Sequence, residues 1–443
     1  MPAFAGGLLF APVCAGAHPA AALAYAVCES STAPVASLYV HVPFCARKCG
    51  YCAFDSAVES PELVNRCVGA LARELELVSS DLGPRTIFFG GGTPSLLNLR
   101  QWERLLNAMD ALGLLGAAEW TVECNPATVS LEKARLLRSA GVNRLSMGVQ
   151  SFNAALLDRL GRVHTRAMAF KSFDLLRQAG FDNLNLDLMF AIPGQTLAVW
   201  RQTLHEATAL GSEHLSCYEV IYEEDTPLYA QLHAGRFALD EDLACAMYEE
   251  LVEHAARAGL EQYEVANFAR PGPRPELAPG RKVLDGAAPV ALSPPGAQAP
   301  RNAPEPGLPF FCCRHNVNYW RGGSFYGVGP SATGYVRGAR TKNWSNVRRY
   351  CELLERDERA IESREELSPL ARAGETAAFG LRMLAGWPFT EFQRATGYDL
   401  RREWAGDMAQ LVEQGWGRLS PDRFQLTPQG LRFADAAARL FLR

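Results

Sequence analysis

Six short apolar runs alternate with helical patterns between residues 37 and 220 of this 443-residue chain. Such runs are typical of strands buried on both faces, and their alternation with helices predicts a parallel sheet. Polar and Gly-rich motifs recur where the strands end, which favours an α/β fold of the partial TIM-like (β/α)6 barrel type. The predicted strands are Ser37–Val42, Thr86–Gly90, Trp120–Cys124, Arg144–Gly148, Leu184–Met189 and His214–Val220. Predicted helices include Pro61–Ser79 and Leu131–Ala140, the second of which stops at Gly141.

Composition sets two segments apart from this pattern. Residues 1–36 are rich in Ala and Gly, contain neither Lys nor Arg, and predict a disordered or targeting extension. A secretory signal is not expected, because such signals begin with a positively charged region and this segment has none. An organelle transit peptide stays open: such peptides are poor in acidic residues, as this segment is, but they are usually rich in Arg, which this segment lacks. The expected location is the cytoplasm, or the mitochondrial matrix or plastid stroma if the extension is a transit peptide. Residues 271–310 hold 11 of the 27 prolines and predict a disordered insertion.

The rest of the chain divides into a core at residues 37–270 and a last part at residues 311–443. After residue 350 the pattern is mostly helical. A short strand is predicted at Arg423–Leu426, and Thr427-Pro428 opens a final helix. These features predict a smaller α-rich, winged-helix-like C-terminal domain.

Charge and hydropathy exclude some classes of protein. The formal net charge is −4, so no whole-chain field attracts nucleic acid, which is not an expected partner. No uncharged apolar run reaches the roughly 18–20 residues that span a bilayer. The winged-helix-like pattern leaves a third possible class of function, a DNA-binding regulator. The net negative charge of the chain argues against this class.

Three of the 12 cysteines crowd together at Cys45, Cys49 and Cys52, directly after the first predicted strand. Their C-x3-C-x2-C spacing suits three corners of one cubic 4Fe–4S cluster, which leaves the fourth iron open. An open iron can chelate the amino and carboxylate groups of S-adenosylmethionine. The alternative is a zinc site in which His41 is the fourth ligand.

A glycine-rich segment, Gly90-Gly91-Gly92-Thr93-Pro94-Ser95, follows the second predicted strand. Consecutive glycines let the backbone approach a ligand closely, although alone they more often mark a turn. Placed one strand–helix unit after the cysteines, the segment strengthens the prediction of a cofactor site.

Six further motifs follow one another along the chain: Tyr39-x-His41-x-Pro43-Phe44-Cys45, Val122-Glu123-Cys124-Asn125-Pro126, Gly148-Val149-Gln150-Ser151-Phe152, Asn185-Leu186-Asp187, Gln262-Tyr263-Glu264 and His315-Asn316-Val317-Asn318-Tyr319-Trp320. Together with the cysteines and glycines, they resemble the radical S-adenosylmethionine superfamily. Within it, they resemble the branch that holds oxygen-independent coproporphyrinogen III oxidases and HemW-type heme chaperones. The resemblance runs from about residue 36 to the C-terminus, with residues 271–310 as an interruption.

The resemblance implies which residues hold the cofactors. Cys45, Cys49 and Cys52 are expected to ligate the cluster, and Tyr39 is expected to pack near the sulfonium of S-adenosylmethionine. A carboxylate can pair with an ammonium or sulfonium group, and an arginine with a carboxylate. Taken alone, Arg162 also fits a solvated cation at a helix end. The other expected contacts to S-adenosylmethionine are Gly91, Gly92, Thr93, Glu123, Gln150, Arg162 and Asp187.

Two features separate oxidase from chaperone within this resemblance. The oxidases carry a further cysteine two positions after the third ligand, where this chain has Phe54. The chaperones carry an HNxxYW motif, present here from His315 to Trp320. His315 is expected to be an axial ligand of haem, with Tyr319 and Trp320 stacked on a porphyrin face. The alternative is a structural turn, in which His315 is hydrogen-bonded to the backbone and the aromatic rings belong to the core.

The predicted function is therefore a heme chaperone that binds haem, a 4Fe–4S cluster and S-adenosylmethionine, and delivers haem to acceptor proteins. The alternative is an oxygen-independent coproporphyrinogen III oxidase, although oxidase activity is not expected. Relatives often carry a histidine where this chain has Thr333. The expected partners are haem, haem-accepting proteins and an electron donor, while membrane-associated acceptors and a homodimer are left open. Cys312 and Cys313 are interpreted as buried thiols.

Overall fold

The computed structural model describes residues 33–272 and 307–443. Its centre is an open nine-stranded sheet with the order β7-β8-β6-β5-β4-β3-β2-β1-β9. Strands β1 to β6 pair in parallel, as the sequence predicts. Their bounds are β1 (Val35–Val42), β2 (Leu82–Gly91), β3 (Glu119–Cys124), β4 (Arg144–Gln150), β5 (Leu184–Phe190) and β6 (His214–Glu219). The short strand β8 (Asn267–Ala269) continues the sheet antiparallel to β6, and β7 (Glu261–Gln262) pairs antiparallel with β8 at the edge.

The strands lie close to their predicted positions, and the main differences are at their starts. Strand β1 begins at Val35, inside the predicted extension, and β2 begins at Leu82 rather than Thr86. Residues 1–32 of the extension and residues 273–306 of the insertion lie outside the described residues. The predicted boundaries of the domains stay a prediction.

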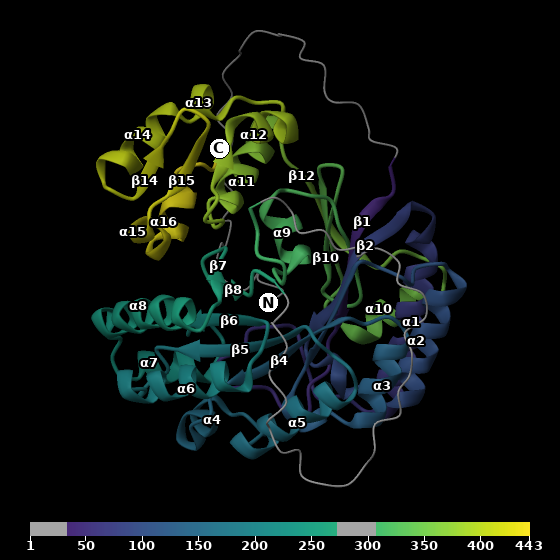
Figure 1. Cartoon of the computed structure of the whole chain (residues 1–443). Helices are drawn as coiled ribbons and strands as arrows, with labels where there is room; N and C mark the ends of the chain where they lie inside the picture. Colours follow the sequence, from purple (N-terminus) through teal and green to yellow (C-terminus); the bar gives the residue numbers. More distant parts are fainter. Residues whose placement is uncertain (1–32, 273–306) are drawn as a thin grey trace.

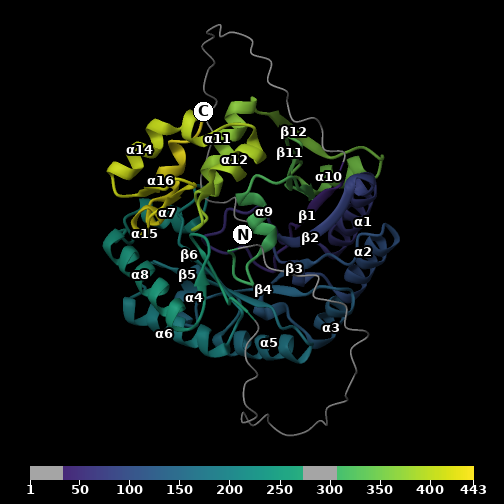
Figure 2. The same cartoon turned by 45° about the horizontal axis from the view of Figure 1, so that its top comes forward.

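Eight helices lie along the outer side of the curved sheet between these strands (Figure 1, Figure 2). Their starts follow from side-chain caps: Ser60 accepts from the Leu63 N–H at the start of α1, and Asn98 and Gln101 form a capping box at α2. Gly141, with φ +106°, ends α3 as predicted. The helices are α1 (Pro61–Val78), α2 (Leu99–Ala111), α3 (Leu131–Ser139), α4 (Ala154–Leu160), α5 (Arg166–Gln178), α6 (Leu197–Leu210), α7 (Pro227–His233) and α8 (Glu241–Arg257).

After residue 307 the chain returns to the core. Helix α9 (Arg314–Trp320) contacts β2, and β9 (Tyr326–Val328) pairs in parallel with β1. A separate antiparallel sheet follows, formed by β10 (Thr333–Val336), β11 (Ala339–Asn343) and β12 (Ile361–Glu366). Helix α10 (Val347–Leu354) packs on α1. The segment with the HNxxYW motif therefore lies against the parallel sheet (Figure 1).

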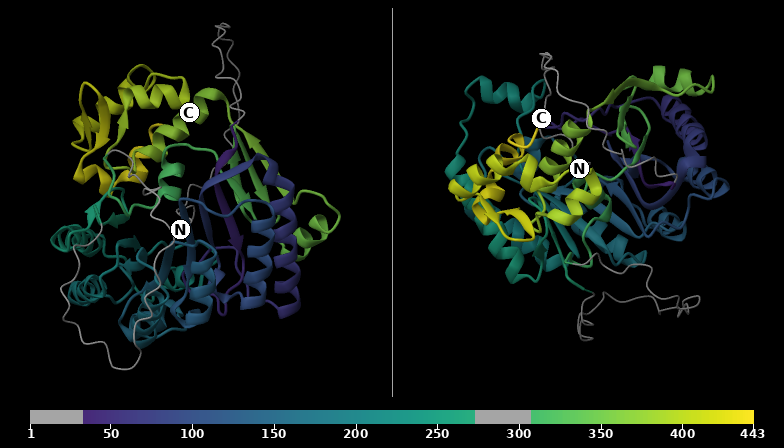
Figure 3. Two further views of the ribbon diagram at one scale, coloured as in Figure 1. Left: turned by 45° about the vertical axis from the view of Figure 1, so that its right-hand side comes forward. Right: turned by 90° about the horizontal axis from the view of Figure 1, so that it is seen from above.

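The C-terminal unit has its own apolar core, which includes Trp387, Trp404 and Phe441. It is α-rich, and β15 spans the predicted residues Arg423–Leu426 in a small antiparallel sheet of the order β13-β15-β14. In Figure 3 this unit (yellow) lies against the teal end of the core. Its elements are α11 (Pro369–Gly380), β13 (Trp387–Pro388), α12 (Phe389–Thr396), α13 (Leu400–Glu403), α14 (Ala405–Glu413), β14 (Gly417–Leu419), β15, α15 (Pro428–Arg432) and α16 (Ala434–Arg439).

Side-chain and backbone bonds fix this unit to the core. Arg432 on α15 pairs with Glu249 on α8 at 2.7 Å, and the Val265 N–H donates to the Arg382 carbonyl at 3.1 Å. Within residues 33–272 and 307–443, no helix combines the length and the apolar character needed to cross a bilayer.

We expect Gly327→Ala to destabilise the fold, because a Cβ at this position in β9 would lie 2.1 Å from the Thr333 carbonyl oxygen. Overpacking of this kind costs roughly 1–3 kcal/mol. The matched control is Gly406→Ala in α14, where a Cβ would meet no atom within 4 Å. There alanine should stabilise the helix by about 0.5–1 kcal/mol. Urea unfolding of the two variants checks the contrast, and equal midpoints would contradict it.

Candidate functional site

The loop that carries the three cysteines follows β1 and is held by backbone hydrogen bonds. The Cys45 N–H donates to the Ala57 carbonyl at 3.0 Å, and the Gly50 N–H donates to the Leu160 carbonyl at 2.9 Å. The three cysteines, Cys45, Cys49 and Cys52, are half-buried free thiols. The loop therefore presents its thiols at the carboxyl edge of the parallel sheet.

The glycines after β2 lie directly against this loop. The Gly92 N–H donates to the Val42 carbonyl at 2.9 Å, and the Thr93 N–H donates to the Phe44 carbonyl at 2.7 Å. A Cβ on Gly92 would lie 2.6 Å from the Phe44 carbonyl oxygen. The Thr93 hydroxyl is 3.5 Å from the Cys45 sulfur. Glycine is thus required by close backbone approach, as the sequence suggests.

One cavity of about 1380 Å³ collects most of the predicted site residues. It begins at the cysteine loop and reaches the C-terminal unit, and it exceeds the roughly 300–1,000 Å³ of a typical small-molecule pocket. The structure therefore brings together residues from five strands and the loops after them. The predicted residues that line it are Cys45, Cys49, Cys52, Gly91, Gly92, Thr93, Glu123, Gln150, Arg162 and Asp187.

Arg162 connects the cysteine loop to the end of β4. Its Nη1 donates to the Cys49 sulfur at 3.5 Å, and its Nη2 donates to the Gly148 carbonyl at 2.5 Å. Its Nε is buried and has no hydrogen-bond partner among the residues that the structure describes. Because Arg162 lines the cavity, this unpaired donor suits a carboxylate, such as that of S-adenosylmethionine. Arg162 is therefore a half-buried cation bonded to the cysteine loop, which argues against the solvated helix-end alternative.

Glu123 and Asp187 place two carboxyl groups at the same end of the cavity. The Gly91 N–H donates to the Glu123 carboxylate at 3.2 Å. Burial raises the pKa of Glu123 from 4.5 to about 8, and the charge of Asp187 adds to the rise. A bound cation would favour the ionised form of Glu123, which suits the ammonium and sulfonium groups of S-adenosylmethionine.

A buried hydrogen-bond network extends from Asp187 into the core. Asn185 donates to Asp187 at 2.8 Å and contacts His214 Nδ1 at 2.6 Å. His214 Nε2 contacts the Tyr263 hydroxyl at 2.8 Å, and that hydroxyl accepts from the Cys313 N–H at 3.0 Å. The network links the cofactor end of the cavity to the start of α9.

Sequence reasoning missed the members of this network as a group. Asn185 and Tyr263 belong to motifs noted in the sequence, and Asn185 shares a strand face with Asp187 two residues later. Glu119 was missed entirely: its carboxylate accepts the N–H groups of Arg314 and His315, each at 2.9 Å. A charged residue at the start of a buried strand was the available signal.

Tyr39 and His41 lie in the core rather than on the cavity wall. Tyr39 packs with Phe88 and Cys313, and its hydroxyl contacts His41 Nδ1 at 2.9 Å. His41 Nε2 contacts the Asp55 carbonyl at 3.1 Å. With both ring nitrogens engaged, His41 is not placed to be the fourth ligand of a zinc ion. The structure also does not bring Tyr39 into the cavity.

The three cysteines fit an iron–sulfur cluster better than a single ion. Within the described ranges, no three His, Cys, Asp or Glu side chains converge on one metal position. A cubic cluster does not need such convergence, because each thiolate binds a different iron. Burial raises the pKa of Cys52 to about 11, with Cys49 and Cys45 adding to the rise. Iron bound at the loop would offset this cost by stabilising the thiolates.

His315 is buried in the core with both ring nitrogens engaged. It is 1% exposed, and its Nδ1 contacts the Thr86 hydroxyl at 3.0 Å while its Nε2 contacts the Tyr319 hydroxyl at 2.7 Å. Burial lowers its pKa to about 3, so the ring is neutral at pH 7. Tyr319 and Trp320 line the cavity, whereas His315 lies behind them. This buried arrangement resembles the structural alternative, except that the partners of His315 are side chains and not the backbone. Haem ligation by His315 requires one of these two hydrogen bonds to open.

The interpretation of Cys312 and Cys313 is confirmed. Both are buried thiols, at 3% and 1% exposure.

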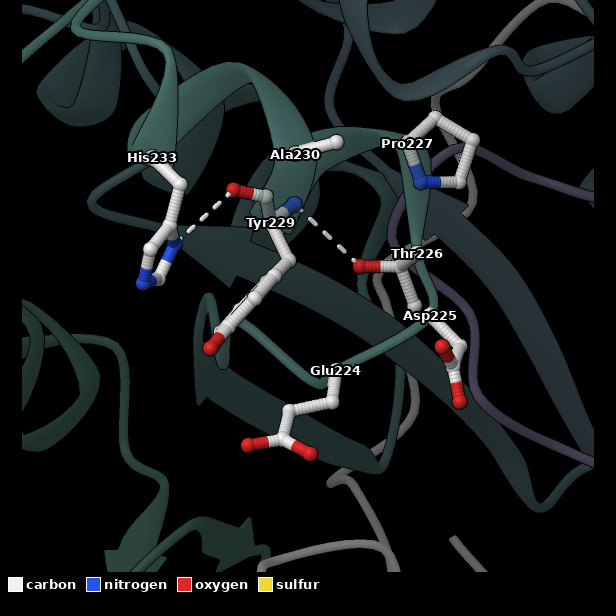
Figure 4. Close-up of a pocket in the computed structure, with 7 residues that line it drawn as sticks. All are labelled: Glu224, Asp225, Thr226, Pro227, Tyr229, Ala230 and His233. Atoms are coloured by element: carbon white, nitrogen blue, oxygen red, sulfur yellow. Dashed lines mark hydrogen bonds between the residues drawn. The ribbon is translucent and has the colours of Figure 1, made fainter.

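A second, shallower pocket of about 650 Å³ lies at α7, where Tyr229 stacks on His233 at 4.0 Å (Figure 4). It contains none of the residues that the sequence motifs single out.

Comparison with known proteins agrees with this site. The model of the Radical SAM superfamily matches residues 39–207, and that of the HemN C-terminal domain matches residues 367–433. Heme chaperone HemW of Bacillus subtilis is 31% identical over 412 residues, covering 92% of this chain and 99% of that protein. HemW of Escherichia coli is 31% identical over 424 residues, covering 92% and 98%. The solved structure of coproporphyrinogen III oxidase (HemN) from Escherichia coli matches with a TM-score of 0.74 at 20% identity, covering 93% and 91%, which shows the fold.

We expect the stability of the cluster-free protein to fall as pH rises from about 4.5 to about 8. In this window folded Glu123 keeps its proton while the unfolded chain loses it, so each pH unit costs up to about 1.4 kcal/mol. Glu123→Gln should flatten this dependence and make the variant more stable than wild type at pH 8. Thermal melts between pH 5 and 8 check this, with Glu132→Gln, an exposed change on α3, as control. Parallel curves for Glu123→Gln and wild type would contradict it.

Proposed function

This chain belongs to the HemW family of the radical SAM superfamily, and we propose that it is a heme chaperone, which binds haem and delivers it to acceptor proteins. Its family cofactors are a 4Fe–4S cluster and S-adenosylmethionine, which together supply one-electron chemistry when bound. One observation carries the proposal: Tyr319 and Trp320 of the HNxxYW motif line the same cavity as the three cysteines. A porphyrin held against these rings would lie in the cavity that holds the other cofactors.

The proposal assigns the cofactors to specific residues. Cys45, Cys49 and Cys52 hold the cluster. Arg162, with its unpaired Nε, orients the carboxylate of S-adenosylmethionine, and Glu123 pairs with its cationic groups. The further contacts to S-adenosylmethionine are Gly91, Gly92, Thr93, Gln150 and Asp187, and Tyr39 supports them from the core behind the cavity.

The runner-up is a coproporphyrinogen III oxidase, and Phe54 argues against it. Phe54 lines the cavity at the position where the oxidases that the sequence resembles carry a cysteine. A phenyl ring offers neither a thiol nor a proton donor. The likeness of fold to the solved oxidase does not favour that activity, because one fold supports several functions.

Partners and location complete the proposal. The haem acceptors and the electron donor are expected partners, while membrane-associated acceptors and a homodimer stay open alternatives. The proposed location is the cytoplasm. The organelle alternative rests on residues 1–36, of which residues 1–32 lie outside the described residues.

We expect the reconstituted protein to bind haem and transfer it to an apo-hemoprotein, without turnover of coproporphyrinogen III. The test is an anaerobic incubation with S-adenosylmethionine, a reductant and coproporphyrinogen III, beside a haem-transfer assay followed by absorbance. Protoporphyrinogen IX accumulating over many turnovers would restore the oxidase. Absence of haem binding would refute the chaperone.

We expect His315→Ala to weaken haem binding and shift the Soret band, because we propose that His315 ligates the iron after its bond to Tyr319 opens. Tyr319→Phe keeps the ring and removes the hydroxyl that holds His315 Nε2, so haem should bind with an unchanged Soret position. Absorbance titrations of both variants check this. If His315→Ala keeps the wild-type Soret band and affinity but lowers the melting temperature, His315 is purely structural.

A further inference from the structure

The charged residues that line the cavity are mixed in sign in the core and mainly arginines at the C-terminal unit. Near the cysteine loop, carboxyl groups and the two arginines Arg47 and Arg162 line the cavity together. The acidic residues that the core contributes are Glu123, Asp187, Glu219, Glu223, Asp240 and Glu241. The arginines of the end at the C-terminal unit are Arg340, Arg372, Arg382, Arg432 and Arg439, and the carboxylates among them are Glu375 and Asp435. An anion is therefore favoured at this end.

Most of these arginines are already neutralised. Arg340 pairs with Glu365 at 2.8 Å and with Glu375 at 2.6 Å. Arg432 pairs with Glu249 at 2.7 Å, and Arg382 lies 3.7 Å from Glu264, whose side chain is 0% exposed. The role of these three arginines is thus to balance carboxylates of the fold.

Two of these arginines, Arg372 on α11 and Arg439 on α16, have no carboxylate within ion-pair distance among residues 33–272 and 307–443, and of the two Arg372 is half-buried whereas Arg439 is exposed. The positive charge of Arg372 opposes the rise that burial causes in the pKa of the Tyr335 hydroxyl. It lies against Gly338, where a Cβ would be 2.0 Å from Arg372 Nη1. Glycine at 338 therefore leaves the space that the guanidinium occupies. Arg372 is a half-buried cation positioned by neighbouring residues and available for an anion.

Aromatic residues connect Arg372 to the HNxxYW motif. Tyr335, whose pKa Arg372 influences, pairs with Phe325 through backbone bonds of 2.7 and 2.9 Å. The Phe325 ring lies 4.4 Å from the Tyr319 ring. These residues all line the cavity. We name this part, formed by Tyr319, Phe325, Tyr335 and Arg372, the distal chamber.

We propose that the distal chamber is the porphyrin subsite, and that Arg372 binds a propionate carboxylate of haem. The inference rests on the proposed function and adds the residue that recognises the ligand's charge. Haem combines a flat apolar body with two carboxylates, which matches aromatic walls beside a half-buried guanidinium that has no carboxylate partner. Arg372 is suited to this role because guanidinium binds carboxylate through two parallel hydrogen bonds.

The test compares haem with haem dimethyl ester, in which the propionates are masked. Arg372→Gln should weaken haem binding roughly tenfold to a hundredfold, as expected for the loss of a hydrogen bond to a charged group. The ester should bind wild type and Arg372→Gln equally. Absorbance titration of the full-length protein gives both affinities, and the melting temperature of each variant reports its folding.

Arg418→Gln is the matched control, because Arg418 is exposed on β14 of the same unit and does not line the cavity. It should bind haem as wild type does. Tyr335→Phe keeps the ring but removes the hydroxyl near Arg372, and it should weaken binding of haem more than that of the ester.

Three outcomes would overturn the subsite. Unchanged haem affinity in Arg372→Gln removes Arg372 as the anchor while leaving haem binding by the chain intact. Equal losses for haem and ester show that Arg372 acts only on folding. If wild type binds neither compound, the chaperone function fails together with the subsite.

Discussion

The parallel pairing of β1 with β2 determines where the cofactor end of the cavity lies. Parallel strands end at one edge of the sheet, so the cysteine loop after β1 and the glycines after β2 must meet there. The N–H groups of Gly92 and Thr93 then donate to carbonyl groups of Val42 and Phe44. A side chain on Gly92 would prevent these bonds, and the thiols would lose their fixed position opposite Glu123 and Arg162.

The parallel sheet also explains why residues distant in sequence act at one site. Each further strand brings its own polar residue to the same edge: Glu123 from β3, Gln150 from β4 and Asp187 from β5. Behind this edge, Asn185, His214 and Tyr263 satisfy one another's hydrogen bonds in the core. A buried polar network of this kind is stable only when its members are paired, which ties α9 firmly to the sheet.

Much of this arrangement could be predicted from the sequence, because the strands are apolar and the motifs follow them directly. The six parallel strands required only periodicity and position. The cysteine loop followed from its spacing, whereas Glu123, Gln150, Arg162 and Asp187 were expected only from the resemblance to the radical S-adenosylmethionine superfamily. Strand β9 could not be predicted, because three residues are too few to show a hydrophobic period and because their partners in β1 are distant in sequence, with Tyr326 opposite Leu38. The positions of Tyr39 and His315 in the core depend on the side chains that pack against them, such as Phe88, whose ring contacts both. Sequence spacing does not determine these tertiary contacts.

The two ends of the cavity differ in how they hold their charge. Arg372 is charged at any physiological pH, so the distal chamber presents a permanent cation. Glu123, with a pKa of about 8, is mostly protonated at pH 7 until a cation arrives. Binding of a cationic ligand beside Glu123 must therefore release a proton, whereas binding of a carboxylate to Arg372 need not. In the proposed arrangement, the cationic groups of S-adenosylmethionine lie beside Glu123 and a propionate of haem lies beside Arg372. Only the first of these two binding steps is then coupled to pH through a carboxylate of the site.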